Sequence, residues 1–165
     1  MRRKDREMDT DFAWKIVDKC EYAVLAMADM GGSPYCIPIS ICRDGSFVYF
    51  HCALQGKKLD LLRGNPKVCL TCVGDTHRMA DKFTTEYESA VIMGTASEVL
   101  QDCEKIHALQ LLCERHAPTN MCAFEEAVVR SLSNTGIWKI NVSQITGKRK
   151  KYDTQGKEMK FGRIE

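Results

Sequence analysis

The sequence predicts a single, mainly β domain, organised as an antiparallel barrel with peripheral helices. About six apolar stretches read as strands, and short turns join most of them. The regular alternation of strands and helices that marks a doubly wound parallel sheet is absent. A chain of 165 residues is long enough for one proper core and hardly long enough for two.

The individual elements follow from hydrophobic periodicity and from turn residues. Strands are predicted at 22–28, 35–42, 47–50, 68–73, 87–100 and 136–145. Helices are predicted at 9–20, 56–63, 102–116 and 123–132. Asp9 offers a capping oxygen to the first helix. Pro38 cannot donate to a ladder, so its strand is expected at an edge or at a bulge. We expect a loop at 74–85, a bend at Gly94 and a loosely held chain beyond Gly147.

Composition and charge exclude several classes of protein. Hydrophobic residues make up 44% and charged residues 28% of the chain, which is typical of an ordinary globular protein. No apolar run approaches the roughly 20 residues of a membrane span, and residues 1–6 lead into no apolar signal core. The net charge of +2 is too small to demand a nucleic-acid partner. We therefore expect a cytoplasmic protein with neither a membrane nor a nucleic-acid partner.

The cysteines predict a reduced protein without a metal. Their number is nine, which is odd, and most have apolar neighbours, so small buried hydrophobes are the simplest interpretation. Cys69 and Cys72 form a single CxxC with no second pair at zinc-site spacing. Cys103 and His107 could share one face of a helix, but no third ligand is evident. We expect no metal site.

The stretch with the clearest chemistry runs from Phe50 to Lys58. A strand ends at 50–53, a short loop with Gly56 follows, and a helix then opens on Lys57 and Lys58. Free amides at a helix start and two lysines suit a terminal phosphate. Two lysines that are simply exposed to solvent and bind no ligand would give the same sequence pattern. His51 is either a structural residue at a strand end or a group that contacts a ligand and moves a proton near neutral pH.

Six stretches share an order and spacing with a known family. They are Met1–Met8, Tyr35–Ser40, Phe50–Ala53 with Gly56–Asp60, Asn65–Val68, Tyr87–Val91 with Gly94–Ala96, and Ile145–Lys148. Through them the chain resembles the FMN-binding split barrels of the pyridoxamine 5'-phosphate oxidase-like family, and within it the nitroimidazole-resistance-protein-like branch. The resemblance covers residues 1–150 as one FMN-binding domain and leaves 151–165 as a basic C-terminal tail.

The resemblance implies a homodimer of six-stranded split barrels with FMN at the interface. By this analogy, backbone groups of three residues line the edge of the isoalloxazine ring: Pro38, Ile39 and Ser40. Three more lie along the ribityl chain and the ring: His51, Cys52 and Ala53. Lys57 and Lys58 hold the phosphate. Five residues approach from neighbouring strands or from the other subunit: Tyr87, Glu88, Ser89, Trp138 and Lys139. In the nitroimidazole-resistance-protein-like branch, a histidine near the flavin takes part in the reaction, and His51 matches the position of that histidine.

The implied activity is that of an FMN-dependent oxidoreductase acting on a small aromatic or nitro-type electron acceptor. An arginine-rich substrate signature is not evident, which argues against vitamin B6 oxidation. Two alternatives stay open at this point. The protein could store flavin or sense redox state without a dedicated substrate, or the same barrel could hold haem or a deazaflavin.

Overall fold

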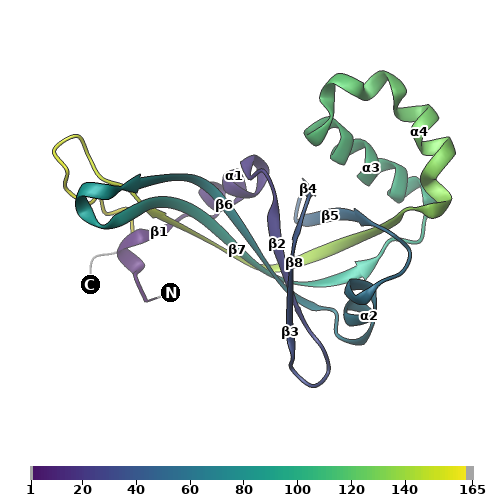
Figure 1. Ribbon diagram of the computed structural model, residues 1–165, viewed down its shortest axis with the longest axis horizontal. Helices are drawn as coiled ribbons and strands as arrows, with labels where there is room; N and C mark the ends of the chain where they lie inside the picture. The colour runs from purple at the N-terminus through teal and green to yellow at the C-terminus, as the bar shows by residue number, and fades with distance from the viewer. Residues whose placement is uncertain (1, 163–165) are drawn as a thin grey trace.

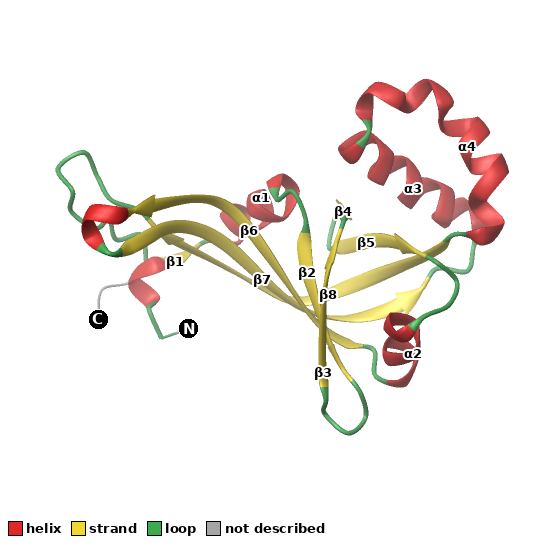
Figure 2. Ribbon diagram, viewed as in Figure 1, coloured by secondary structure: helices red, strands yellow, loops and turns green. Residues whose placement is uncertain are grey.

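The computed structural model describes residues 2–162, and its strands form one antiparallel sheet with helices around it (Figures 1 and 2). Met1, which begins the first stretch of the resemblance, and 163–165, which end the predicted tail, lie outside the described residues. The strand order is β3-β2-β6-β7-β8-β5-β4, and β1 pairs with β8. No described helix is both long enough and apolar enough to span a membrane.

The elements are bounded as follows. The strands are β1 Glu7–Met8, β2 Ala23–Ala28, β3 Pro34–Ile39, β4 Cys42–Asp44, β5 Phe47–Cys52, β6 Lys67–Met79, β7 Thr84–Glu98 and β8 Gly136–Lys150. The helices are α1 Thr10–Lys19, α2 Lys57–Gly64, α3 Asp102–His116 and α4 Phe124–Ser131. Short 3-10 turns occupy Lys4–Arg6, Ala80–Lys82, Pro118–Ala123 and Leu132–Asn134. The predicted fold class is confirmed, with eight strands in the described chain because β1 and β4 are short additions to the six expected.

Local sequence signals account for several of these elements. Asp9 caps α1, because its Oδ1 accepts a hydrogen bond of 2.7 Å from the amide of Phe12. Pro38 lies in β3, the first strand of the sheet order, as expected for a strand at an edge. The bend at Gly94 coincides with a register shift between β7 and β8. A Cβ at this glycine would lie 2.6 Å from the carbonyl oxygen of Asn141, so no larger residue fits without a shift.

The predicted loop at 74–85 is wrong. In its place β6 continues to Met79 and β7 begins at Thr84, so that the two strands form an extended hairpin arm. The side chains of the arm are mostly exposed. Because neither face of these strands is buried, apolar and polar residues do not alternate along them, and the usual sequence signal of a strand is missing. The last strand is also longer than expected, because β8 runs on to Lys150 and pairs with β7 along the arm. Figure 1 shows this arm projecting from the barrel beside α1.

The described part of the tail is held against the N-terminus. Tyr152 pairs with Glu158 in an isolated bridge, and the amide of Phe161 donates to the carbonyl of Asp5 over 3.0 Å. Glu158 Oε1 lies 2.7 Å from Arg6 Nε. The expectation of a loosely held chain beyond Gly147 is therefore not met for these residues, because ion pairs anchor them.

Two cores lie on opposite faces of the barrel strands. The main core fills the barrel with side chains such as Leu25, Leu70 and Ile92, and α1 packs against it. A second core lies between α3 and the other face of β5 and β8, around Tyr49 and Ile137. Because side chains alternate along a strand, each residue of β5 and β8 faces either the barrel or α3.

Candidate functional site

The start of α2 carries the features expected of an anion site. Gly56 precedes the helix with a φ of 133°, a conformation that residues with a Cβ rarely adopt. The amides of Leu59 and Asp60 donate to the carbonyl of Gly56 over 2.8 and 3.2 Å. No side chain caps this helix start, so its first amide groups stay available to a ligand.

The two lysines of this helix lie over aromatic rings from two different strands. Lys57 Nζ is 4.5 Å from the centroid of the Tyr35 ring in β3. Lys58 Nζ is 5.4 Å from the centroid of the Phe50 ring in β5. Within residues 2–162 neither ammonium forms an ion pair with a carboxylate. Cation–π contacts orient the ammonium groups while their hydrogen-bonding protons stay free for an anion.

Neither aromatic partner is among the cofactor-binding residues that the resemblance implies. Tyr35 is half-buried and Phe50 is fully buried. Both lie in segments that carry the family resemblance, which was the available signal. The contacts of these two rings with the lysines depend on how α2 packs against the sheet, and this packing cannot be predicted from the sequence.

His51 stands near the end of β5, opposite Ile137 of β8, and among the α2 lysines it is Lys58 whose charge acts on it. Its pKa is held below the ordinary value, first by desolvation and then by the positive charges of Lys58 and His116. A histidine with a lowered pKa is neutral at pH 7 and can accept or donate a proton there. Beside it, Cys52 Sγ contacts the carbonyl of Gly136 at 3.7 Å, and Ala53 is exposed. The end of β5 therefore places a neutral imidazole within electrostatic reach of Lys58.

The predicted residues of β3 divide between two faces. Pro38 and Ser40 are exposed, whereas Ile39 is 8% exposed and belongs to the barrel core. Ile39 can therefore meet a ligand only through its backbone. Since β3 is an edge strand, one side of its backbone is not used in sheet pairing.

Glu88 and Ser89 lie on β7, away from α2. Glu88 is buried beside α1, with Oε2 2.6 Å from Lys19 Nζ and Oε1 3.2 Å from Arg149 Nε. Ser89 is half-buried and pairs with Lys148 of β8. The structure of one chain does not bring these two residues to the lysines of α2, because β7 meets α1 and the arm at this point (Figure 1).

Trp138 and Lys139 also have partners inside the chain. Trp138 lies opposite Phe50 and is 3% exposed, and its indole Nε1 has no hydrogen-bond partner in the described chain. Lys139 points to α3, where its Nζ lies 2.7 Å from Glu104 Oε1. Lys139 is thus on the opposite face of β8 from Trp138. Only the indole shares the face that carries Phe50.

The outer face of the sheet is broad and carries few charges. A cavity of about 450 Å³ lies over β2, β6 and β7. Its lining includes Ala26, Cys69, Met93 and Thr95, and among these Met93 is 46% exposed. Of these four side chains Met93 and Thr95 are exposed, whereas Ala26 and Cys69 are half-buried.

These features define a class of protein: an antiparallel split barrel in which a two-turn helix that starts with two lysines follows the end of a strand. The family described as pyridoxamine 5'-phosphate oxidase matches residues 9–149, and the chain belongs to this family. No relative is found among curated proteins.

Solved structures share the fold at low sequence identity. A proposed 5-nitroimidazole antibiotic resistance protein from Bacteroides thetaiotaomicron is 22% identical, with a TM-score of 0.71 over 87% of this chain and 86% of that chain. An FAD-binding protein from Mesorhizobium loti is 18% identical, with a TM-score of 0.66 over 87% and 96% of the two chains. An FAD- and haem-binding protein from Mycobacterium smegmatis is 18% identical, with a TM-score of 0.74 over 88% and 73%.

Proposed function

We propose that this protein binds FMN and reduces small aromatic or nitro-type electron acceptors. The observation that carries the proposal is the pair Lys57 and Lys58, which lie at an uncapped helix start and have no carboxylate partner in residues 2–162. The named structural relatives include an FAD-binding protein and an FAD- and haem-binding protein. A bound flavin would supply the hydride or single-electron chemistry.

The residues present fit the chemical groups of FMN. The phosphate carries close to two negative charges, which two ammonium groups and the free amides of α2 can offset. The edge of β3, with Pro38 and Ser40 exposed, offers backbone groups to the polar rim of a ring system. His51 is neutral at pH 7 and would hold or transfer a proton next to the substrate.

The proposal includes a homodimer. In a single chain the cluster at α2 and β5 lies on the surface, so a partner is needed to enclose a flavin ring. The outer sheet face around Met93 is the surface that we expect a second copy to cover. Ser89 lies on a strand of that face and would reach the site of the other copy. That Glu88, Trp138 and Lys139 contact the flavin stays a prediction.

The phosphate site is tested by the double substitution Lys57→Ala and Lys58→Ala. Two lost charge-assisted contacts should weaken FMN binding at least about 100-fold, measured by fluorescence titration of FMN. The matched control removes two exposed lysines elsewhere, Lys15→Ala with Lys157→Ala, and should leave the affinity unchanged. An equal affinity in both double variants would place the phosphate elsewhere.

The enzymatic part is tested at His51. Reduction of nitroaromatic compounds by a nicotinamide cofactor, followed anaerobically, should fall at least about tenfold in His51→Ala, because a positioned acid or base contributes at least that much. The content of bound FMN should stay the same. A wild-type protein that binds FMN but turns over no acceptor would favour the storage or sensing alternative. If the purified protein shows the absorption spectrum of haem, the flavin proposal is wrong and the barrel binds haem instead.

A further inference from the structure

One edge of the arm has no partner strand within the described chain. β2 pairs with β6 only from Cys69 to Cys72, whereas β6 continues to Met79. From Val73 onward β6 therefore pairs with β7 on one side alone, and no further backbone hydrogen bond in residues 2–162 involves 73–78. An unpaired strand edge presents a row of amide and carbonyl groups to which another strand can bind.

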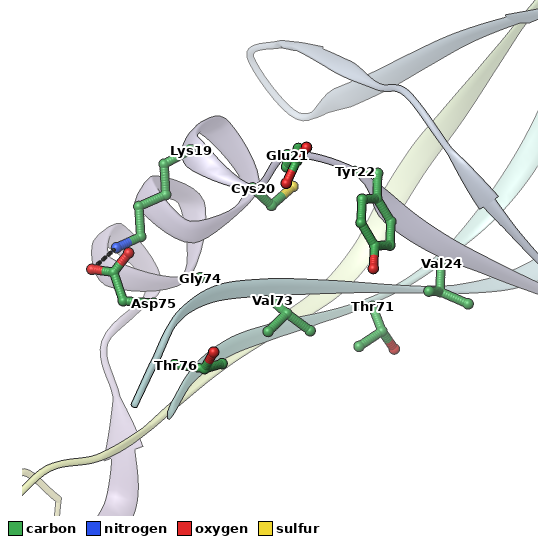
Figure 3. A pocket seen from close by; sticks show the side chains of 10 residues that line it. All are labelled: Lys19, Cys20, Glu21, Tyr22, Val24, Thr71, Val73, Gly74, Asp75 and Thr76. Carbon is green, nitrogen blue, oxygen red and sulfur yellow. Dashed lines mark hydrogen bonds and ion pairs between the residues drawn. The ribbon is translucent and has the colours of Figure 1, made fainter. Parts of the chain in front are cut away.

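The base of this edge borders an open cavity. The cavity has a volume of about 430 Å³ and lies where the end of α1 and the start of β2 diverge from β6, and Figure 3 shows the side chain of Tyr22 directed toward the strand that carries Val73. Tyr22 is 54% exposed and Val73 is 47% exposed. Glu21 also lines the cavity, and no cation pairs with it in the part of the chain that the structure describes. The cavity thus offers two apolar surfaces and one carboxylate to a partner.

The tip of the arm, 79–83, carries the complementary features. Phe83 is 100% exposed and adopts a φ of 50°, a left-handed conformation at the turn between the two strands. Arg78 is exposed just before the tip and forms no ion pair within residues 2–162. A fully exposed aromatic ring is stabilised when a partner removes it from water. The tip therefore presents a ring and a cation, and the base presents a cavity with a carboxylate.

The edge is self-complementary when two copies pair antiparallel about Thr76. β6 has a bulge at 74–75, where two residues occupy the space of one residue of β7. With this bulge counted as one position, a two-fold axis at Thr76 sets His77 opposite Asp75 of the second copy. The same register brings Arg78 to the cavity at the base of the second arm. A two-fold contact of this kind uses the same surface on both copies and closes on itself.

The competing interpretation is that the charged residues and the bulge keep this edge from pairing, as they do on many edge strands. The order of the charges favours pairing, because the register about Thr76 sets opposite charges rather than like charges against each other. Asp75 Oδ2 lies 2.8 Å from Lys19 Nζ, but the Asp75 side chain is 85% exposed. Its second oxygen can therefore accept from His77 of another copy.

We propose that the free edge of β6 pairs with the same edge of a second copy, so that the tip of each arm lies in the cavity at the base of the other. Phe83 then packs against Tyr22 of the second copy, and Arg78 lies beside Glu21 of the second copy. This contact is separate from the outer sheet face around Met93. It does not depend on flavin binding, so each proposal can fail without the other.

The first test asks whether Thr76 meets Thr76 of a second copy. In full-length Thr76→Cys under mild oxidation, we expect a disulfide between the introduced thiols of two chains, because facing side chains of an antiparallel pair stand close enough for one. Peptide mapping by mass spectrometry identifies this link among those of the native cysteines. Thr85→Cys is the matched control, since Thr85 is exposed on β7 of the same arm but not on the free edge. No more linkage in Thr76→Cys than in Thr85→Cys would overturn the proposal.

The second test examines the register and the tip in the Thr76→Cys background. His77→Asp should slow the linkage about tenfold, because two symmetric pairs of like charges then face each other. Combining it with Asp75→His exchanges the charges and should restore the rate. Phe83→Ser should also slow the linkage, while the Tm stays the same because Phe83 is fully exposed. An unchanged rate in His77→Asp would contradict the register, and an unchanged rate in Phe83→Ser would contradict the contact of the tip.

Discussion

The two ends of the sheet treat charged side chains in opposite ways. Around the arm and the tail, two carboxylates each have a cation against them: Glu88 of β7 lies between Lys19 and Arg149, and Glu158 of the tail contacts Arg6. At α2, Lys57 and Lys58 lie over aromatic rings with no carboxylate partner in the described chain, whereas Arg63 at the other end of the helix pairs with Glu98. The carboxylates of the arm side are neutralised, whereas Lys57 and Lys58 meet no carboxylate within residues 2–162. Lysines over aromatic rings are not confined to α2, because Lys148 Nζ lies 5.6 Å from the centroid of the Tyr87 ring on the arm side.

This difference separates charges that hold the fold from charges that can bind a ligand. A carboxylate that already accepts from two cations gains little from a ligand, and its loss leaves those cations without a partner. An ammonium over an aromatic ring loses only a weak contact when an anion replaces water around it. On this basis we expect Glu88 to act mainly on the stability of the fold and Lys57 and Lys58 to act mainly on ligand binding.

The largest effect on stability is expected at Glu88. Glu88→Gln should lower the free energy of unfolding by about 3 kcal/mol, because it removes the charge from a buried network. Urea denaturation measures this loss, and Glu125→Gln on the exposed side of α4 is the control. If Glu88→Gln instead kept its stability and lost FMN, Glu88 would belong to the flavin site, as the sequence predicted.

A smaller, pH-dependent effect is expected at Glu158. Arg6 and then Lys160 lower its pKa from 4.5 to about 2. Because the folded value is the lower one, the contribution to stability is complete above pH 4.5 and disappears as the pH falls through about 2. Glu158→Gln should cost about 1 kcal/mol at pH 7 and almost nothing at pH 2.

The measurement for Glu158 is the difference between wild type and variant in urea unfolding at each pH. Asp5 also titrates with a lowered pKa in this region, so the absolute stability of either protein is not informative. A difference that stays constant down to pH 2 would show that Glu158 acts through packing and not through its charge.

The smallest effect on stability is expected at the α2 lysines. Lys57→Ala with Lys58→Ala should change the free energy of unfolding by less than about 0.5 kcal/mol, since Lys57 is exposed and neither side chain has an ion pair to lose. Urea unfolding without flavin measures this value. If the double lysine variant lost as much free energy of unfolding as Glu88→Gln does, the lysines would stabilise the fold as Glu88 does, and the distinction between fold-holding and ligand-binding charges would be wrong.

Local signals were sufficient for much of the fold. The cap at Asp9, the edge strand at Pro38 and the helix start at Gly56 each follow from the chemistry of one residue and its neighbours. The arm at 74–85 could not be found in this way. Its strands are held by pairing with each other and with β8, and no buried face marks them in the sequence.

In the candidate site, too, some features follow from neighbouring residues in the sequence and others depend on tertiary packing. The sequence by itself determined that a glycine and two lysines would stand at a helix start just after a strand that carries a histidine, because all four residues are within eight positions of one another at a strand–helix junction. Only the tertiary structure decided that rings of Tyr35 and Phe50 hold those lysines and that Lys139 turns to Glu104. These contacts join residues far apart in the chain, and their distances depend on how helices pack on the sheet.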